Sequence, residues 1–218
     1  MTVVRRHPLV AFFVLAYALS WCLVPFRTFL PPGPLIAALI VVAIAHGRAG
    51  LRELGSRMIG WRVGWIWWVA AVGLPLAVHA LTVLLNGALG APSPSFDQFS
   101  PWYAVIMVFA LRLINPLDEA LGEEPGWRAF AQPRLQTIRS PLLSTSILGI
   151  LVAGWHLPLL LPSFHLEPID LLTTVAVTFW YAWLFNHAGG SALITLVAHA
   201  TEGSINTSEL WPAATDLT

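Results

Sequence analysis

Residues 122–135 read GEEPGWRAFAQPRL, which places three charged side chains, Glu123, Glu124 and Arg128, within one short stretch. The rest of the 218-residue chain is strongly apolar: 57% of its residues are hydrophobic, only 10% are charged, and the mean hydropathy is +0.73. A soluble domain has about 25% charged residues, so the composition predicts an all-α membrane protein with several spans. A charge inside a bilayer costs roughly 2.5–3.5 kcal/mol on insertion scales, and we therefore expect these three residues to have a function.

Apolar runs separated by Pro, Gly and Arg clusters predict a polytopic transmembrane helical bundle of about seven spans, with residues 1–218 as one domain. The first apolar run is too long for the roughly 7–15-residue core of a signal peptide, so we expect a first transmembrane helix rather than a cleaved signal. An Arg-rich loop is expected from 47 to 62. The expected spans are 9–30, 34–46, 63–89, 102–139, 141–161, 169–186 and 191–208.

The arginines predict the orientation of the bundle. Cytoplasmic loops carry an excess of Lys and Arg, and a cytoplasmic N-terminus would place nine of the eleven arginines on the cytoplasmic side. We therefore expect a multi-pass protein of the bacterial cytoplasmic (plasma) membrane with its N-terminus in the cytoplasm. The net charge is zero, so nucleic acid is not an expected partner. The nine arginines are Arg5, Arg6, Arg48, Arg52, Arg57, Arg62, Arg128, Arg134 and Arg139.

The segment 102–139 is expected to form one long, kinked helix. At 100° per residue, Arg112, Asn115, Glu119 and Glu123 fall on one face. Such a polar stripe predicts a water-filled intramembrane cavity, although a helix end in the headgroup region is the alternative. Glu124 and Arg128 stand at positions i and i+4, the spacing that pairs opposite charges on a helix, which predicts a structural ion pair.

Counting along the helices from a turn at Ser140 suggests which side chains meet. Glu123 lies about 25 Å before this turn and His156 about 24 Å after it, at 1.5 Å per residue. We therefore expect Glu123 and His156 to face each other across the cavity. The same counting places His199 about 10 Å shallower, with Glu202 and Asn206 following it at i+3 and i+7.

Three motifs resemble one family. GEEPGWRAFAQPRL resembles the EExxxR signature of the CPBP intramembrane proteases, which include the type II CAAX prenyl endopeptidases and bacteriocin-processing homologues. GWHLPLLLP, residues 154–162, resembles their second motif, and WLFNHAGGSALITLVAHA, residues 183–200, resembles their third. The resemblance covers nearly the whole chain, and it implies a glutamate-dependent endopeptidase that acts on a peptide or lipidated-peptide substrate among membrane lipids.

The resemblance also implies roles for individual residues. Glu123 would activate a water as general base, and His156 would help to hold that water. His199, with a polar residue four positions later, would stabilise the oxyanion, and Glu124 and Arg128 would support the site. One carboxylate and two imidazoles also match a His₂Glu zinc set, so Glu123, His156 and His199 are the candidate ligands if a metal is bound; we favour a water without metal and leave both open.

The chain departs from the family pattern at three places. The position four after His199 is Gly203, which has no side chain, so Glu202 or Asn206 is the expected substitute. The position four before His156 is Val152 where an aromatic residue is typical, and we expect no counterpart of the family's final helix after the third motif.

These observations predict an intramembrane endopeptidase whose cavity opens to the cytoplasm. The departures favour the main alternative, a non-catalytic membrane scaffold or a bacteriocin self-immunity protein of the same fold. A transporter is a third interpretation, but the sequence shows no inverted repeat or paired broken helices.

Overall fold

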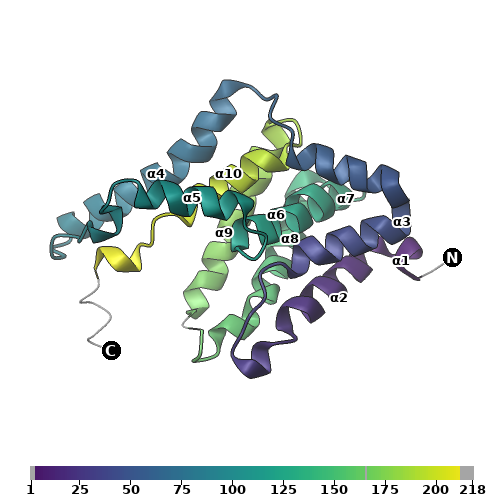
Figure 1. Cartoon of the computed structure of the whole chain (residues 1–218), viewed down its shortest axis with the longest axis horizontal. Coiled ribbons are helices and arrows are strands. Elements are labelled where there is room, and N and C mark those ends of the chain that lie inside the picture. The colour runs from purple at the N-terminus through teal and green to yellow at the C-terminus, as the bar shows by residue number, and fades with distance from the viewer. Residues whose placement is uncertain (1–2, 165, 212–218) are drawn as a thin grey trace.

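The structure is a computed structural model that describes residues 3–164 and 166–211. Every regular element in these residues is helical, and Figure 1 shows the helices as a bundle around a central broken segment. Four helical stretches have the length and apolar composition to cross a membrane: Pro8–Phe26, Gly33–Met58, Trp65–Ala88 and Pro168–His187. Two further apolar helices, Pro141–Trp155 and Ala192–Glu202, are shorter. The chain is therefore a multi-pass helical membrane protein, and four of the seven expected spans have the length to cross by themselves.

The first two long helices differ from their expected limits. Helix α2 (Pro8–Trp21), preceded by the short α1 (Val3–Arg6), ends well before residue 30 and is followed by a 3₁₀ turn, η1 (Val24–Phe26), and a left-handed residue, Arg27 (φ 57°). Helix α3 (Gly33–Met58) includes residues 47–58 of the segment that we expected to be a loop from 47 to 62. Gly47 allows this, since its φ of 60° bends the chain without steric cost and lets the Arg-rich half begin as a second helical stretch.

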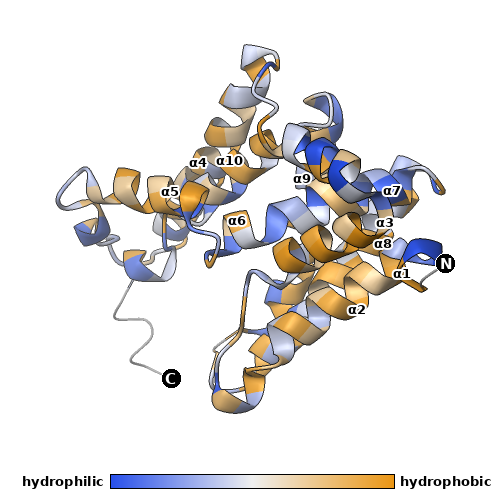
Figure 2. Ribbon diagram, turned by 45° about the vertical axis from the view of Figure 1, so that its right-hand side comes forward, coloured by the Kyte–Doolittle hydropathy of each residue, from blue (hydrophilic) through white to orange (hydrophobic). Residues whose placement is uncertain are grey.

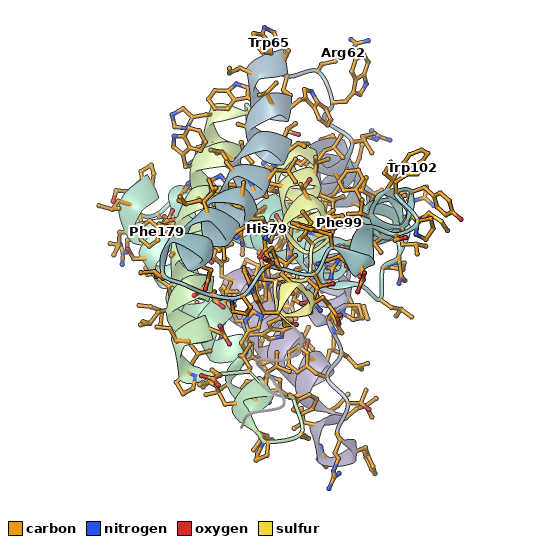
Figure 3. All side chains as sticks on the ribbon, turned by 90° about the vertical axis from the view of Figure 1, so that its left-hand side faces the viewer. Arg62, Trp65, His79, Phe99, Trp102 and Phe179 are labelled. Carbon is orange, nitrogen blue, oxygen red and sulfur yellow. The ribbon has the colours of Figure 1, made fainter. Side chains whose placement is uncertain are left out.

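Three helices on the other side of the bundle follow the predicted pattern more closely. Helices α4 (Trp65–Ala88) and α9 (Pro168–His187) agree with the expected spans within a few residues. Arg62 and Trp65 lie together at one end of α4, as an arginine and an interfacial aromatic residue would at a membrane surface (Figure 3). Helix α10 (Ala192–Glu202) packs against α4 and is shorter than the expected span.

The expected long helix over 102–139 is wrong. The segment is divided into α5 (Ala104–Ile114), α6 (Glu119–Glu124), a π-helical turn η3 (Pro125–Ala131) and α7 (Gln132–Gln136). Asn115 is extended before Pro116, and Asp118 starts α6 by accepting a hydrogen bond from the Ala120 amide at 3.2 Å. A residue before proline avoids the helical region and Asp favours helix starts, so the predicted stripe of polar residues on one helix face does not form.

The segment that carries the glutamates is held by aromatic packing. Phe12 of α2 contacts Trp127 and Phe130 of η3, with ring centroids 5.4 and 4.7 Å apart. Trp127 also contacts Trp155 at the end of α8 (Pro141–Trp155), with centroids 5.6 Å apart. These four rings are buried, so η3 lies in the interior of the bundle between α2, α3 and α8.

The two ends of the bundle differ in charge. At one end, Arg5 Nε donates to the Ile44 carbonyl at 2.9 Å and Arg57 Nη1 donates to the Ala129 carbonyl at 2.9 Å, which joins α1, α3 and η3. Hydrophilic residues of α1 and α7 colour this end in Figure 2. At the other end lie the loop between α2 and α3 and the loop between α8 and α9 (Figure 1).

Candidate active site

Two glycines bring the glutamates close to the start of α3. A Cβ atom added to Gly122 would lie 3.0 Å from the backbone of Pro31, and one added to Gly126 would lie 2.5 Å from Pro34 Cβ and 2.7 Å from the Pro34 backbone. Only glycine permits these approaches at positions four residues apart on one side of the segment. Both glycines set the position of Glu123, which lies between them in the sequence, and no pattern in the sequence predicted this role.

One pocket of about 630 Å³ gathers the polar residues of the motifs. It is lined by all three candidate catalytic residues, Glu123, His156 and His199. The supporting residues Glu124, Arg128 and Glu202 line it as well, and so does Glu119 from the predicted stripe. Other residues of the lining are Arg27, Thr28, Phe29, Pro31, Trp127, Val152, Trp155, Leu159, Phe164, Leu166, Asp170, Thr173, Thr174, Val177, Thr178 and Tyr181.

Glu123 is held by one neutral donor. Its side chain is almost completely buried, and Oε2 accepts a hydrogen bond from Trp127 Nε1 at 3.1 Å. Among the residues that the structure describes, no arginine or histidine lies within salt-bridge distance of this carboxylate. The carboxylate therefore keeps one oriented contact and presents the rest of its surface to the pocket.

Glu124 has two basic partners. Its Oε2 lies 3.8 Å from Arg128 Nε, which confirms the pair predicted from the i, i+4 spacing. Its Oε1 accepts a hydrogen bond from His199 Nδ1 at 3.2 Å. Counting along the chain predicts a shallower level for His199 because it assumes continuous, antiparallel helices, whereas the glutamate segment is broken and π-helical. No local signal in the sequence could have paired Glu124 with a residue 75 positions later.

The two histidines are oriented by different acceptors. Helix α8 ends at Trp155, and His156 is its C-cap residue. Nδ1 of His156 lies 2.9 Å from the Val152 carbonyl oxygen. Because a carbonyl oxygen can only accept a hydrogen bond, Nδ1 carries the hydrogen. The contact between Glu124 and His199 likewise fixes a hydrogen on Nδ1 of His199. A catalytic imidazole is commonly oriented by a hydrogen bond from one of its ring nitrogens to a neighbouring group. In both histidines Nε2 remains for a further partner.

The place of the missing side chain at Gly203 is filled by another residue. A Cβ atom at Gly203 would lie 2.6 Å from Cζ and Nη1 of Arg112. This guanidinium lies 3.2 Å from Asp118 and 3.5 Å from Glu119, so it links the ends of α5, α6 and α10. Gly203 therefore leaves space for Arg112. The sequence predicts for Arg112 only a place in the polar stripe.

The two expected substitutes for a side chain at position 203 lie in different places. Glu202 ends α10 and lines the pocket, while its carbonyl lies 3.1 Å from His79 Nε2. Asn206 does not line the pocket: it lies beyond the end of α10, and its side chain accepts hydrogen bonds from Ser208. The predicted i+7 spacing from His199 fails because the helix ends before Asn206.

The residues do not fit the alternative metal set. No group of three or more His, Cys, Asp or Glu side chains in residues 3–164 and 166–211 is arranged to hold a metal ion. Glu123, His156 and His199 line the same pocket, but they do not form such a group. We therefore derive no step through a metal, and the arrangement offers instead a buried carboxylate base with two oriented imidazoles whose Nε2 atoms remain for further partners.

Comparison with known proteins agrees with the motifs. A search of the curated proteins gave no match. Residues 100–204 match the sequence model of the family described as type II CAAX prenyl endopeptidase Rce1-like. The matched region, just under half of the chain, contains Glu123, Glu124, Arg128, His156 and His199, and it supports the resemblance to the CPBP intramembrane proteases that the three motifs predicted.

Proposed function

We propose that the protein is an intramembrane endopeptidase that hydrolyses membrane-presented peptides with a water activated by Glu123. The observation that carries this proposal is the shared pocket of Glu123, His156 and His199. The membrane spans and the protease family support a membrane peptide as substrate. The pocket is also large enough for a peptide segment, since binding pockets commonly have about 300–1,000 Å³.

In the proposed reaction, Glu123 takes a proton from water as the water oxygen bonds to the carbonyl carbon of the peptide. The Trp127 hydrogen bond orients the carboxylate for this step. His156 accepts a hydrogen bond from the water at Nε2. His199 is protonated in this step: its Nδ1 donates to Glu124, and its Nε2 donates to the developing oxyanion. The C–N bond then breaks, and the proton on Glu123 passes to the leaving amine, so the enzyme returns to its initial state.

The test is a comparison of purified, liposome-reconstituted protein with its Glu123→Gln variant. Peptides extracted from membranes of the expression host serve as substrates, and mass spectrometry identifies new termini. Glu123→Gln keeps the shape and the acceptor for Trp127 but removes the base, so we expect the new termini to disappear. Glu209→Gln is the matched control, because Glu209 is exposed and outside the pocket. Cleavage that survives Glu123→Gln refutes the mechanism.

The same comparison tests the non-catalytic alternative. One observation favours a scaffold: Gly203 offers no side chain, and the guanidinium of Arg112 that fills its place does not line the pocket. A scaffold or immunity protein should perform its role equally well with Glu123→Gln. An in-cell rescue assay that compares the two forms therefore separates the two functions.

The orientation of the pocket follows from the arginines. Eight of them lie on α1, on α3 after Gly47, in the link to α4, or in and just after α7, and we infer that this end is cytoplasmic. No residue of 32–118, 129–151 or 182–198 lines the pocket, whereas the α2–α3 and α8–α9 loops contribute Arg27, Phe29, Leu159 and Phe164. We infer that the pocket opens toward the end opposite the arginines. If the N-terminus lies in the cytoplasm, this opening faces away from the cytoplasm, contrary to our expectation. A cytoplasmic opening would require the N-terminus to lie on the outside.

Cysteine accessibility tests this orientation. In a Cys22→Ser background, Thr28→Cys places a single thiol at the mouth of the pocket and Ser56→Cys places one at the arginine-rich end. We expect a membrane-impermeant maleimide to label Thr28→Cys in intact cells and Ser56→Cys only after permeabilisation. The opposite pattern would mean that the pocket opens to the cytoplasm and that the N-terminus lies outside.

A further inference from the structure

Helix α9 presents a polar face to the pocket, and one hydroxyl on it is unused. Asp170, Thr174, Thr178 and Tyr181 follow one another at helical spacing and all line the pocket. The two threonine hydroxyls donate to the carbonyls of the residues four positions earlier, each at 2.9 Å. In the part of the chain that the structure describes, the Tyr181 hydroxyl has no hydrogen-bond partner although the side chain is only 2% exposed.

A buried hydroxyl without a partner is unusual. Leaving such a group unpaired costs about 1–3 kcal/mol, and most buried polar atoms in folded proteins are satisfied. A structural tyrosine at this position could be replaced by phenylalanine without losing any contact of the ring. An unpaired donor that lines a pocket therefore indicates that its partner is a molecule bound in that pocket.

The surroundings of Tyr181 place this donor beside the proposed catalytic groups. Its ring centroid lies 5.4 Å from that of His199, and Arg128 Cζ lies 5.1 Å from the ring on its face. Arg128 and His199 are the two partners of Glu124. Tyr181 thus lies beside the oriented imidazole and lines the same pocket as the base Glu123, while Gly203 supplies no donor.

We propose that the Tyr181 hydroxyl is a catalytic hydrogen-bond donor to the carbonyl oxygen of the scissile peptide bond. The inference rests on the proposed endopeptidase function and adds a residue that none of the motifs contains. The phenol is a neutral donor, so it offers a hydrogen to the oxyanion without adding a buried charge. Tyr181 forms no covalent bond in this role and keeps its proton throughout.

The test is Tyr181→Phe, assayed on a synthetic peptide that spans a cleavage site found with the unmodified protein. Removing one oxyanion donor typically lowers kcat by about 10²–10³, and we expect a loss of at least about 100-fold with a KM that changes less than about threefold. The free energy of unfolding in mixed micelles should stay equal or rise, because the variant removes an unpaired buried hydroxyl.

Tyr17→Phe is the matched control with the opposite expected pattern. The Tyr17 hydroxyl donates to the Leu151 carbonyl and lies outside the pocket lining. Its removal should lower the unfolding free energy and leave kcat within about twofold. Tyr181→Phe with kcat within threefold of the unmodified protein overturns the inference, and so does unfolding of Tyr181→Phe, since it would reveal a structural partner for the hydroxyl.

Failure of the proposed function gives a separate result. If the unmodified protein shows no Glu123-dependent cleavage, the endopeptidase proposal falls and the role of Tyr181 falls with it. If Tyr181→Phe keeps Glu123-dependent cleavage with kcat within threefold of the unmodified protein, the function stands and only the donor is wrong.

Discussion

Substitution of Gly126 by alanine tests how the glutamate segment is positioned. The added Cβ would lie 2.5 Å from Pro34 Cβ and 2.7 Å from the carbonyl carbon and oxygen of Pro34. Carbon atoms pack best at about 3.5–4.0 Å, so η3 and the start of α3 must separate by about 1 Å. The obstacle is backbone in the first turn of a long helix, which cannot move aside as a flexible side chain would.

The magnitude follows from this displacement. Overpacking a well-packed interior typically costs about 1–3 kcal/mol, and we expect the unfolding free energy to fall by that amount. Gly126 lies three residues after Glu123, so the shift should also move the carboxylate relative to His156 and His199. A misplacement of about 1 Å can lower a rate about 100-fold, and we therefore expect activity to fall much more than stability.

Two measurements on the same preparation separate these effects. Unfolding in mixed micelles gives the free energy, and cleavage of the synthetic peptide gives kcat. Gly87→Ala in α4 is the matched control, because an added Cβ there meets nothing within 4 Å and alanine favours the helix by up to about 1 kcal/mol. If Gly126→Ala unfolds and cleaves like the unmodified protein, the close approach of η3 to Pro34 is wrong.

Three further substitutions have expected outcomes. Arg128→Met leaves the buried Glu124 carboxylate with His199 as its remaining basic partner and should lower the unfolding free energy by up to about 3–5 kcal/mol. Removing the carboxylate as well should restore part of it, as a double-mutant cycle in micelles would measure. Trp127→Phe keeps most of the ring packing but removes the donor to Glu123. The rate of peptide cleavage should therefore fall about tenfold, which corresponds to a rise of about 1.4 kcal/mol in the activation free energy. Gly203→Ala should change the unfolding free energy by less than about 1 kcal/mol, because its Cβ meets only the flexible end of Arg112, whose ion pairs are partly exposed.

The sequence was sufficient for features with a local physical cause. Hydropathy predicted a helical membrane protein, and the spacing of Glu124 and Arg128 predicted their ion pair. The limits of α4 and α9 followed from apolar runs bounded by turns. Each of these predictions depends on residues within a few turns of one another, where periodicity and charge spacing are informative.

Features that depend on breaks in the chain were predicted less well. The signals for the end of α5 were present, since Asn115 precedes a proline and Asp118 is a good helix start, but the strong helical periodicity on both sides outweighed them. Gly47 was treated as the end of a helix, although its positive φ only bends α3. The approach of His199 to Glu124 depends on packing between separate helices, so no count along the chain could supply it.

The two adjacent glutamates show why only one of them suits the role of base. Successive residues on a helix point about 100° apart, so Glu123 and Glu124 meet different neighbours. Glu124 is held between Arg128 and His199, and a carboxylate with two basic partners is stabilised as an anion and has little tendency to accept a proton. Glu123 has one neutral donor and no basic partner within salt-bridge distance among the described residues. The acid that the protein leaves without a counter-charge is therefore the one that can take a proton from water, while its neighbour orients the imidazole beside it.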